Sequence, residues 1–230
     1  MTSQHSYPAA VLLDHDGTLV NTEPLWEQAK ERIAREHGTH WSAEDTRAVL
    51  GYSIEATLLR LQKVGVDLPL DELEQKLTSY MHEIFAESEY EFLPGIRPFL
   101  QELKDAGVPA AIVTNATTSV AERTAGLAPG AFSAVIGDQQ TEHSKPHPEP
   151  YLKAAEALGV DPKDCVAVED SPSGTRSALD AGMRVIVVPG EVAVPEDLGH
   201  ARIRHEELSL EKVRALFGDE FGDGASIKSE

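Results

Sequence analysis

Two carboxylates separated by one residue, Asp14 and Asp16, offer the clearest chemistry in this sequence. They follow the short apolar run Ala9–Leu13 and precede Gly17, which lets the chain turn tightly. One carboxylate can attack phosphorus and carry the phosphoryl group, while a second protonates the leaving oxygen and then activates water. Residues two apart face the same side of an extended strand, so both can flank one substrate. The pair is therefore placed for this division of roles.

Further polar side chains follow other apolar runs. Thr114 and Asn115 follow one run, Glu169 and Asp170 follow another, and Lys145 lies in a proline-rich loop before a helical pattern. Ligands bind beyond the carboxyl ends of parallel strands, so we expect all these groups to converge with the acidic pair. Converging carboxylates repel one another unless a cation lies among them, and oxygen ligands favour magnesium over zinc. Lys145 would add a fixed positive charge beside a bound phosphate.

The elements that must position these residues alternate between short apolar runs and amphipathic stretches that end at glycine. We expect strands at Ala9–Leu13, Pro109–Val113, Ser133–Ile136, Cys165–Val168 and Arg184–Val188. We expect helices at Ile96–Ala106, Tyr151–Leu158 and Ser173–Ala181. Strand and helix in alternation indicate an α/β fold, a doubly wound parallel sheet with helices on both faces.

One long segment interrupts this alternation. Its apolar spacing predicts helices at Leu25–Glu36, Ala43–Leu50, Ile54–Val64 and Leu70–Ala86, with no convincing strand. The sequence Leu93-Pro94-Gly95 then marks the return to the sheet pattern. We therefore expect a core domain at 1–20 and 93–230, and an inserted α-helical cap domain at 21–92.

Composition narrows the classes of partner. The net charge of −19 would repel a phosphate backbone, so no nucleic acid partner is expected. No apolar run reaches the roughly 18 residues that cross a membrane, so no membrane partner is expected. The first residues lack a signal-peptide pattern, and we expect a cytoplasmic protein. Cys165, the only cysteine, lies in an apolar run and is interpreted as a core residue.

Taken together, these motifs closely resemble those of the haloacid dehalogenase superfamily, in the branch with a helical cap inserted after the first strand. The resemblance extends from about Ala9 to Phe217. The four motifs are Asp14-His15-Asp16-Gly17-Thr18, Thr114-Asn115, Lys145 within Ser-Lys-Pro-His-Pro, and Glu169-Asp170-Ser171. His15 is the histidine of interest, because it lies inside a motif.

The resemblance implies a role for each motif. Asp14 would be the nucleophile and Asp16 the general acid and base. Mg²⁺ would be held by Asp14, Asp16 through its backbone carbonyl, and Asp170, with Glu169 alongside. The transferring phosphoryl group would be bound by Thr114, the backbone of Asn115 and Lys145. The cap would close over the substrate and exclude water. Many relatives act as monomers, and we expect the same here.

The residues also favour one reaction within the superfamily. Dehalogenases lack an aspartate at the place of Asp16, so phosphoryl transfer is favoured over carbon–halogen cleavage. Related phosphomutases carry a histidine twelve residues after the nucleophile, where this chain has Trp26. They also carry a phosphate-binding arginine early in the cap, whereas Gly51-Tyr52-Ser53 is followed here by Ile54. The favoured function is hydrolysis of a small phosphorylated metabolite. The cap residues expected to contact the substrate are Glu23, Trp26 and Gly51.

Three alternatives stay open. A phosphomutase like β-phosphoglucomutase is the first, although its two cap features are missing. A phosphonoacetaldehyde hydrolase needs a desolvated lysine in the cap, and the available Lys30, Lys63 and Lys76 lie among charged residues. A binding module without activity would be expected to lose an essential residue, and all are present. The string Glu-Pro-Leu-Trp at 23–26 resembles sugar-phosphate phosphatases, so a sugar phosphate is the expected substrate.

Overall fold

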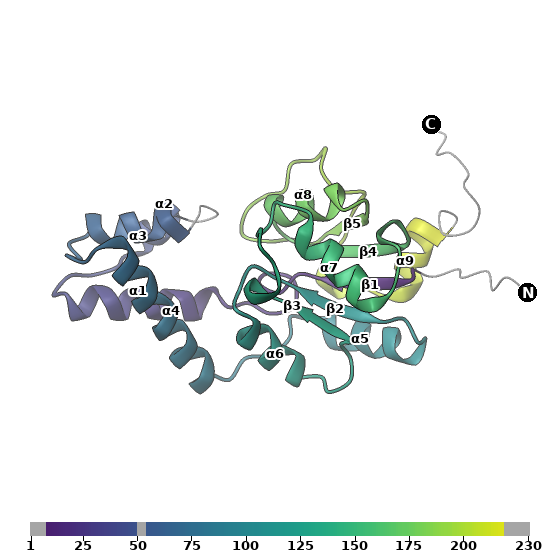
Figure 1. Cartoon of the computed structure of the whole chain (residues 1–230), viewed down its shortest axis with the longest axis horizontal. Helices are drawn as coiled ribbons and strands as arrows, with labels where there is room; N and C mark the ends of the chain where they lie inside the picture. Colours follow the sequence, from purple (N-terminus) through teal and green to yellow (C-terminus); the bar gives the residue numbers. More distant parts are fainter. Residues whose placement is uncertain (1–7, 50–53, 219–230) are drawn as a thin grey trace, which may run out of the picture. The chain divides into compact units, whose positions relative to one another are not determined.

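The chain forms two compact units in a computed structural model that describes residues 8–49 and 54–218 (Figure 1). The first unit combines the chain up to Val20 with the chain from Glu91 onward, and the second is Asn21–Tyr90. The first holds the sheet and the second is helical. No helix among the described residues is both long enough and apolar enough to span a bilayer.

The first unit is built on a six-stranded sheet in the order β3-β2-β1-β4-β5-β6. Its strands are β1 (Ala10–Leu13), β2 (Ala110–Val113), β3 (Ala134–Ile136), β4 (Cys165–Glu169), β5 (Arg184–Val187) and β6 (Ala201–Arg202). Every neighbouring pair is parallel, and β1 lies between β2 and β4. This confirms the predicted doubly wound α/β fold, because the strand order reverses direction on either side of β1.

Strands β1, β2 and β3 are apolar throughout, and β4 and β5 are apolar except at one end, because both faces of the sheet are covered. Side chains alternate between the faces, and Ala10 and Leu12 of β1 join the buried cluster that contains Tyr151 and Ala154 of α7 (Glu149–Leu158). Figure 1 shows α7 lying across this face of the sheet. The same cluster includes Ala178 of α8 (Pro172–Asp180). The strands of the first unit that lead to Asp14, Thr114 and Glu169 are thereby anchored in one core.

Besides three short 3-10 helices, two α-helices and one strand among the described residues of the first unit were not predicted. They are α6 (Thr118–Gly126), β6, and α9 (Leu210–Phe217), which packs against α5 (Ile96–Asp105). Helix α6 buries threonine and alanine side chains, so its inner face gives a weak apolar signal. Strand β6 has only two residues, which is too short for any periodicity to show.

The second unit consists of four helices among its described residues. They are α1 (Glu23–Glu36), α2 (Ala43–Val49), α3 (Ile54–Lys63) and α4 (Leu70–Glu87). Helices α1 and α4 pack together, burying Ile33 on one side and Leu73, Leu77 and Met81 on the other. All four predicted helices are present, and the predicted end of the second at Leu50 lies outside the described residues.

The two ends of the inserted segment meet on the first unit. Val20 forms an antiparallel bridge with Phe92, and the Leu93 N–H donates to the Leu19 carbonyl at 2.8 Å. The chain therefore leaves and re-enters the first unit at adjacent backbone positions.

Candidate active site

The register of the sheet brings the ends of three strands to one level. Leu13 of β1 is paired with Ile112 of β2 and with Val168 of β4. The next residue, Asp14, continues the ladder, since its N–H donates to the Val168 carbonyl at 3.0 Å. Because β1 is central, the residue that follows it has motif residues on both sides.

The ammonium of Lys145 contacts residues from three strand ends of this site. It donates to Asp14 Oδ1 at 2.6 Å, to Glu169 Oε1 at 2.6 Å and to the Val113 carbonyl at 2.8 Å. An ammonium has three donors, so all of them are used. It also lies 5.1 Å from the centre of the Tyr151 ring. In this state Lys145 neutralises carboxylates, and contact with a phosphate would require exchange of one of these bonds.

Asn115 holds the loop that carries Lys145. Its side-chain oxygen accepts the Lys145 N–H at 2.8 Å, and its side-chain nitrogen donates to the Lys145 carbonyl at 3.3 Å. The hydroxyl oxygen of Thr114, which is buried, accepts the Ala116 N–H at 3.0 Å and keeps its proton for another acceptor. Thr114 and Asn115 thus shape the same edge as Lys145, one through its hydroxyl and the other through its amide.

Glu169 is fully buried and serves as an internal anchor. Its Oε1 accepts the Tyr151 hydroxyl at 2.6 Å in addition to Lys145, and its Oε2 accepts the Ser171 hydroxyl at 3.1 Å. A Cβ at Gly174 would lie 1.9 Å from Oε1, so glycine is needed there to leave room for the carboxylate. A buried charge requires this degree of hydrogen bonding.

Asp170 is held against two glycines. A Cβ at Gly17 would lie 2.0 Å from Asp170 Oδ2, and a Cβ at Gly190 would lie 2.4 Å from the same atom. Gly17 also has a φ of +84°, which other residues rarely adopt. Asp14, Glu169 and Asp170 each present a ligand atom within 4.8 Å of the others. Three buried carboxylates therefore surround a space suited to a cation.

The pKa values of two of these carboxylates are raised, which indicates that the site holds too little positive charge for all of them to be ionised. Burial raises the pKa of Asp14 to about 7, although Lys145 opposes the rise. Burial and the charges of Asp14 and Glu169 raise the pKa of Asp170 to about 9. Burial alone would lower the pKa of Lys145, but Asp14 and Glu169 outweigh it and raise that pKa to about 12. One ammonium does not balance the group, and a divalent ion would favour the ionised carboxylates.

Asp16 is half-buried, and its charge raises the pKa values of both Asp14 and Asp170, so it belongs to the same group. Its loop is fixed by the Gly17 N–H, which donates to the Val20 carbonyl at 2.8 Å. The neighbouring His15 is buried and shares a 2.7 Å hydrogen bond with the Thr124 hydroxyl. Burial lowers the pKa of His15 to about 4, so this histidine is neutral at pH 7.

The predicted cap residues belong to the second unit. The ammonium of the buried Lys30 donates a hydrogen bond to Glu23 Oε1 at 3.1 Å, and it also forms an ion pair with Glu27. Trp26 is half-buried, and its backbone N–H donates to the Thr22 carbonyl at 3.2 Å. Gly51 lies outside the described residues. Their contribution to a substrate site stays a prediction.

Sequence patterns did not reveal Gly174, described above, or three residues that reach the site from other parts of the chain. Tyr151 anchors Glu169, Gly190 makes room for Asp170, and His205 donates from Nε2 to the Gly17 carbonyl at 2.9 Å. Each acts through a contact between elements distant in the chain. The apolar spacing of α7 includes Tyr151 but gives no sign that its hydroxyl meets a carboxylate.

Several known proteins are similar to this chain. The model of the haloacid dehalogenase-like hydrolases matches residues 8–182. Hexitol phosphatase A from Escherichia coli is 36% identical over 210 residues, covering 89% of this chain and 91% of that protein. Protein CbbY from Rhodobacter capsulatus is 30% identical over 219 residues, covering 90% and 96%. A variant of CbbY from Rhodobacter sphaeroides, solved with xylulose-(1,5)bisphosphate, has a TM-score of 0.73 at 27% identity and covers 87% of this chain and 96% of its own.

Proposed function

Because the chain belongs to the haloacid dehalogenase-like hydrolase family, as one of its phosphatases, we propose that it hydrolyses a small sugar or polyol phosphate through a phosphoryl group carried on Asp14. The observation that supports this most directly is the buried triad of Lys145, Asp14 and Glu169, with both contacts at 2.6 Å. A carboxylate held in this way has a fixed orientation, which in-line attack on phosphorus requires.

The proposed reaction has two steps. A carboxylate oxygen of Asp14 forms a bond to phosphorus, the bond from phosphorus to the leaving oxygen breaks, and Asp16 gives that oxygen a proton. Water then attacks phosphorus and gives a proton to Asp16 while the bond between phosphorus and the Asp14 oxygen breaks, so that phosphate leaves and Asp14 is restored. Asp16 fits both roles because it lies close enough to raise the pKa values of its neighbours, yet keeps access to solvent.

The donor set fits Mg²⁺. Asp14 and Asp170 would hold it with the backbone carbonyl of Asp16, and Glu169, whose oxygens already accept three hydrogen bonds, would stand beside it. When bound, the ion would neutralise the charge of the transferring phosphoryl group. Thr114, the backbone of Asn115 and Lys145 would bind the same group from the protein side.

The names of two relatives support the proposed substrate class. Hexitol phosphatase A is named for a polyol phosphate, and the CbbY structure contains a pentulose bisphosphate. We propose that the helical unit 21–90 acts as the cap over the substrate, and that Glu23, Trp26 and Gly51 contribute to selectivity. We also propose that the protein acts as a monomer in the cytoplasm.

Phosphate release from a panel of sugar, polyol and nucleotide phosphates tests the proposal. The wild type would be assayed with Mg²⁺, after thorough chelation, and after Mg²⁺ is restored. Asp14→Asn should abolish turnover and leave the fold intact. Asp105→Asn, an exposed control on α5, should have the turnover of the wild type. Full activity of Asp14→Asn would refute the nucleophile, and activity that survives chelation would refute the metal. Conversion of β-glucose 1-phosphate to the 6-phosphate without phosphate release would identify a phosphomutase instead.

A further inference from the structure

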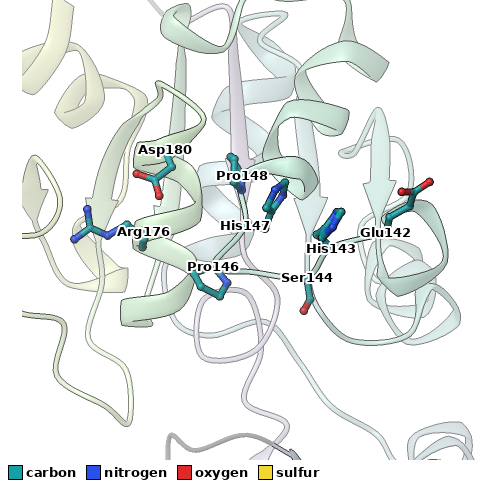
Figure 2. Close-up of a pocket in the computed structure, with 8 residues that line it drawn as sticks. All are labelled: Glu142, His143, Ser144, Pro146, His147, Pro148, Arg176 and Asp180. Atoms are coloured by element: carbon teal, nitrogen blue, oxygen red, sulfur yellow. The ribbon is translucent and has the colours of Figure 1, made fainter.

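The loop that carries Lys145 holds a second group of possible metal ligands, on the side facing solvent. His143 and His147 lie two residues before and two residues after Lys145, and Glu149 begins α7. One ligand atom from each of His143, His147 and Glu149 lies within 4.8 Å of the others. Figure 2 shows the two rings next to each other along the loop, and their centroids are 4.4 Å apart in a stacked arrangement.

Both rings turn the same nitrogen toward Glu149. The Nδ1 atom of His143 is 2.9 Å from Glu149 Oε2, and the Nδ1 atom of His147 accepts the Glu149 N–H at 3.2 Å. The Nδ1 atom of His147 carries a lone pair, whereas the Nδ1 atom of His143 faces a carboxylate oxygen and donates its proton to it, which leaves the lone pair of the neutral His143 ring on Nε2. These contacts place the three side chains around one region, and a bound ion would take the place of the two bonds to Nδ1.

Backbone bonds hold Glu149 in place through its own carboxylate, so a bound ion would share these oxygens with the backbone N–H groups. The N–H groups of Glu142 and His143 donate to the two Glu149 oxygens, each at 2.9 Å. These bonds, led by that from Glu142, lower the pKa of Glu149 to about 2, so it is ionised at neutral pH. The Ser177 hydroxyl donates to the His147 carbonyl at 2.6 Å and fixes the other end of the loop.

The group is open to ions from solvent. His143 and His147 line a pocket of about 590 Å³ together with Glu142, Pro146, Arg176 and Asp180 (Figure 2). The His143 side chain is 59% exposed, so it has room to rotate. Rotation would bring a ring nitrogen to about 2.0–2.1 Å from a bound zinc ion, the distance that zinc requires. The net charge of −19 also raises the local concentration of cations.

We propose that His143, His147 and Glu149 bind one divalent transition-metal ion of the Zn²⁺ or Ni²⁺ type, separate from the buried carboxylates. Imidazole nitrogen prefers these ions, whereas the all-oxygen group of Asp14, Glu169 and Asp170 suits Mg²⁺. The two groups therefore differ in the ion that they select. A bound ion would join the two ends of the segment that carries Lys145.

Calorimetric titration with Zn²⁺ tests this site on the full chain, after chelation and in excess Mg²⁺ to occupy the carboxylates. We expect one Zn²⁺ per chain for the wild type. His147→Ala and His143→Ala should each weaken binding by more than about tenfold, since even changes around the ligands cost about 10–100-fold. The control variant His40→Ala/His82→Ala, exposed histidines of the second unit, should bind as the wild type does.

Two results would overturn the proposal. One is the absence of Zn²⁺ binding to the wild type in excess Mg²⁺. The other is unchanged binding in both His143→Ala and His147→Ala, which would place the ion elsewhere. Because His147 is exposed, its replacement is not expected to unfold the chain, and circular dichroism of each variant would verify this. Loss of phosphatase activity does not enter the test, so it stands apart from the proposed reaction.

Discussion

Lys145 and Asp14, 131 residues apart in the chain, meet at 2.6 Å in the interior of the first unit. The same ammonium reaches Glu169 at 2.6 Å, so a single cation joins the ends of β1 and β4. Removing one partner of a buried charge pair costs more than the pair contributes, because the remaining charges lose their compensation. This contact therefore links the stability of the sheet to the proposed chemistry.

Replacement of Lys145 by methionine should lower both the turnover and the stability of the protein. We expect turnover to fall by about 10²–10³-fold, as for loss of one donor to the reacting group. We expect unfolding to become easier by about 3–5 kcal/mol, because buried carboxylates lose their cation. Phosphate release and urea unfolding measure the two effects. Lys163→Met, which removes a surface pair with Asp161, should change neither appreciably, and equal effects of the two variants would contradict this reading.

Gly17→Ala should disturb the placement of Asp170. Its new Cβ would lie 2.0 Å from Asp170 Oδ2, so we expect loss of activity and a higher Mg²⁺ requirement. Gly107→Ala is the matched control, since its φ of +70° is also positive and nothing lies within 4 Å. The control should lose only about 1–2 kcal/mol of stability through its backbone conformation. Phosphate release as a function of Mg²⁺ concentration separates the two, and a Gly17→Ala enzyme with a normal Mg²⁺ requirement would argue against the contact.

Tyr151→Phe should separate anchoring from chemistry. The change removes one buried hydroxyl from Glu169 and leaves the ring in place, so we expect a loss of about 1–3 kcal/mol in unfolding free energy. Lys145 still holds Glu169, and turnover should fall less than in Lys145→Met. Urea unfolding and steady-state rates, with Tyr80→Phe in the second unit as control, check both statements. A drop in turnover as large as that of Lys145→Met would show that Tyr151 does more than anchor.

Asp45→Asn should change the pH dependence of the second unit. Burial would raise the pKa of Asp45, but bonds from Ser42 and Arg60 outweigh it and lower the pKa from 3.8 to about 2. A lowered pKa stabilises the folded state above pH 3.8, and this contribution is lost as the pH falls through about 2. The variant should be less stable than the wild type at neutral pH, and the difference should shrink toward pH 2.

Fluorescence gives a direct measurement, because both tryptophans of the chain, Trp26 and Trp41, belong to the second unit. Urea unfolding followed in this way across the acidic range reports that unit alone. Asp71→Asn, an exposed control on α4, should show no such trend. A constant difference between Asp45→Asn and the wild type at every pH would rule out the ionic contribution.

The sequence was sufficient for the parts of the molecule governed by local rules. Apolar runs bounded by glycine predicted five of the strands, and polar residues at their ends predicted which edge carries Asp14, Thr114 and Glu169. It was insufficient where a residue acts through tertiary contact. The hydroxyl of Tyr151 and the ring of His205 gain their partners only when α7 and the C-terminal segment are in place. Helix α6, whose buried side chains are small and partly polar, lacked the periodicity on which such predictions depend.

The bridge between Val20 and Phe92 has a consequence for how such a protein can diversify. A segment that enters and leaves through neighbouring backbone positions can be lengthened, shortened or exchanged without altering the spacing of the strands around it. Under the proposed function, selectivity for new substrates would change by exchange of residues 21–90 as a block, while the sheet and the candidate site stay unchanged. A chimera that carries a foreign segment between Val20 and Phe92 would retain the hydrogen bond of Leu93 to Leu19 as its point of closure.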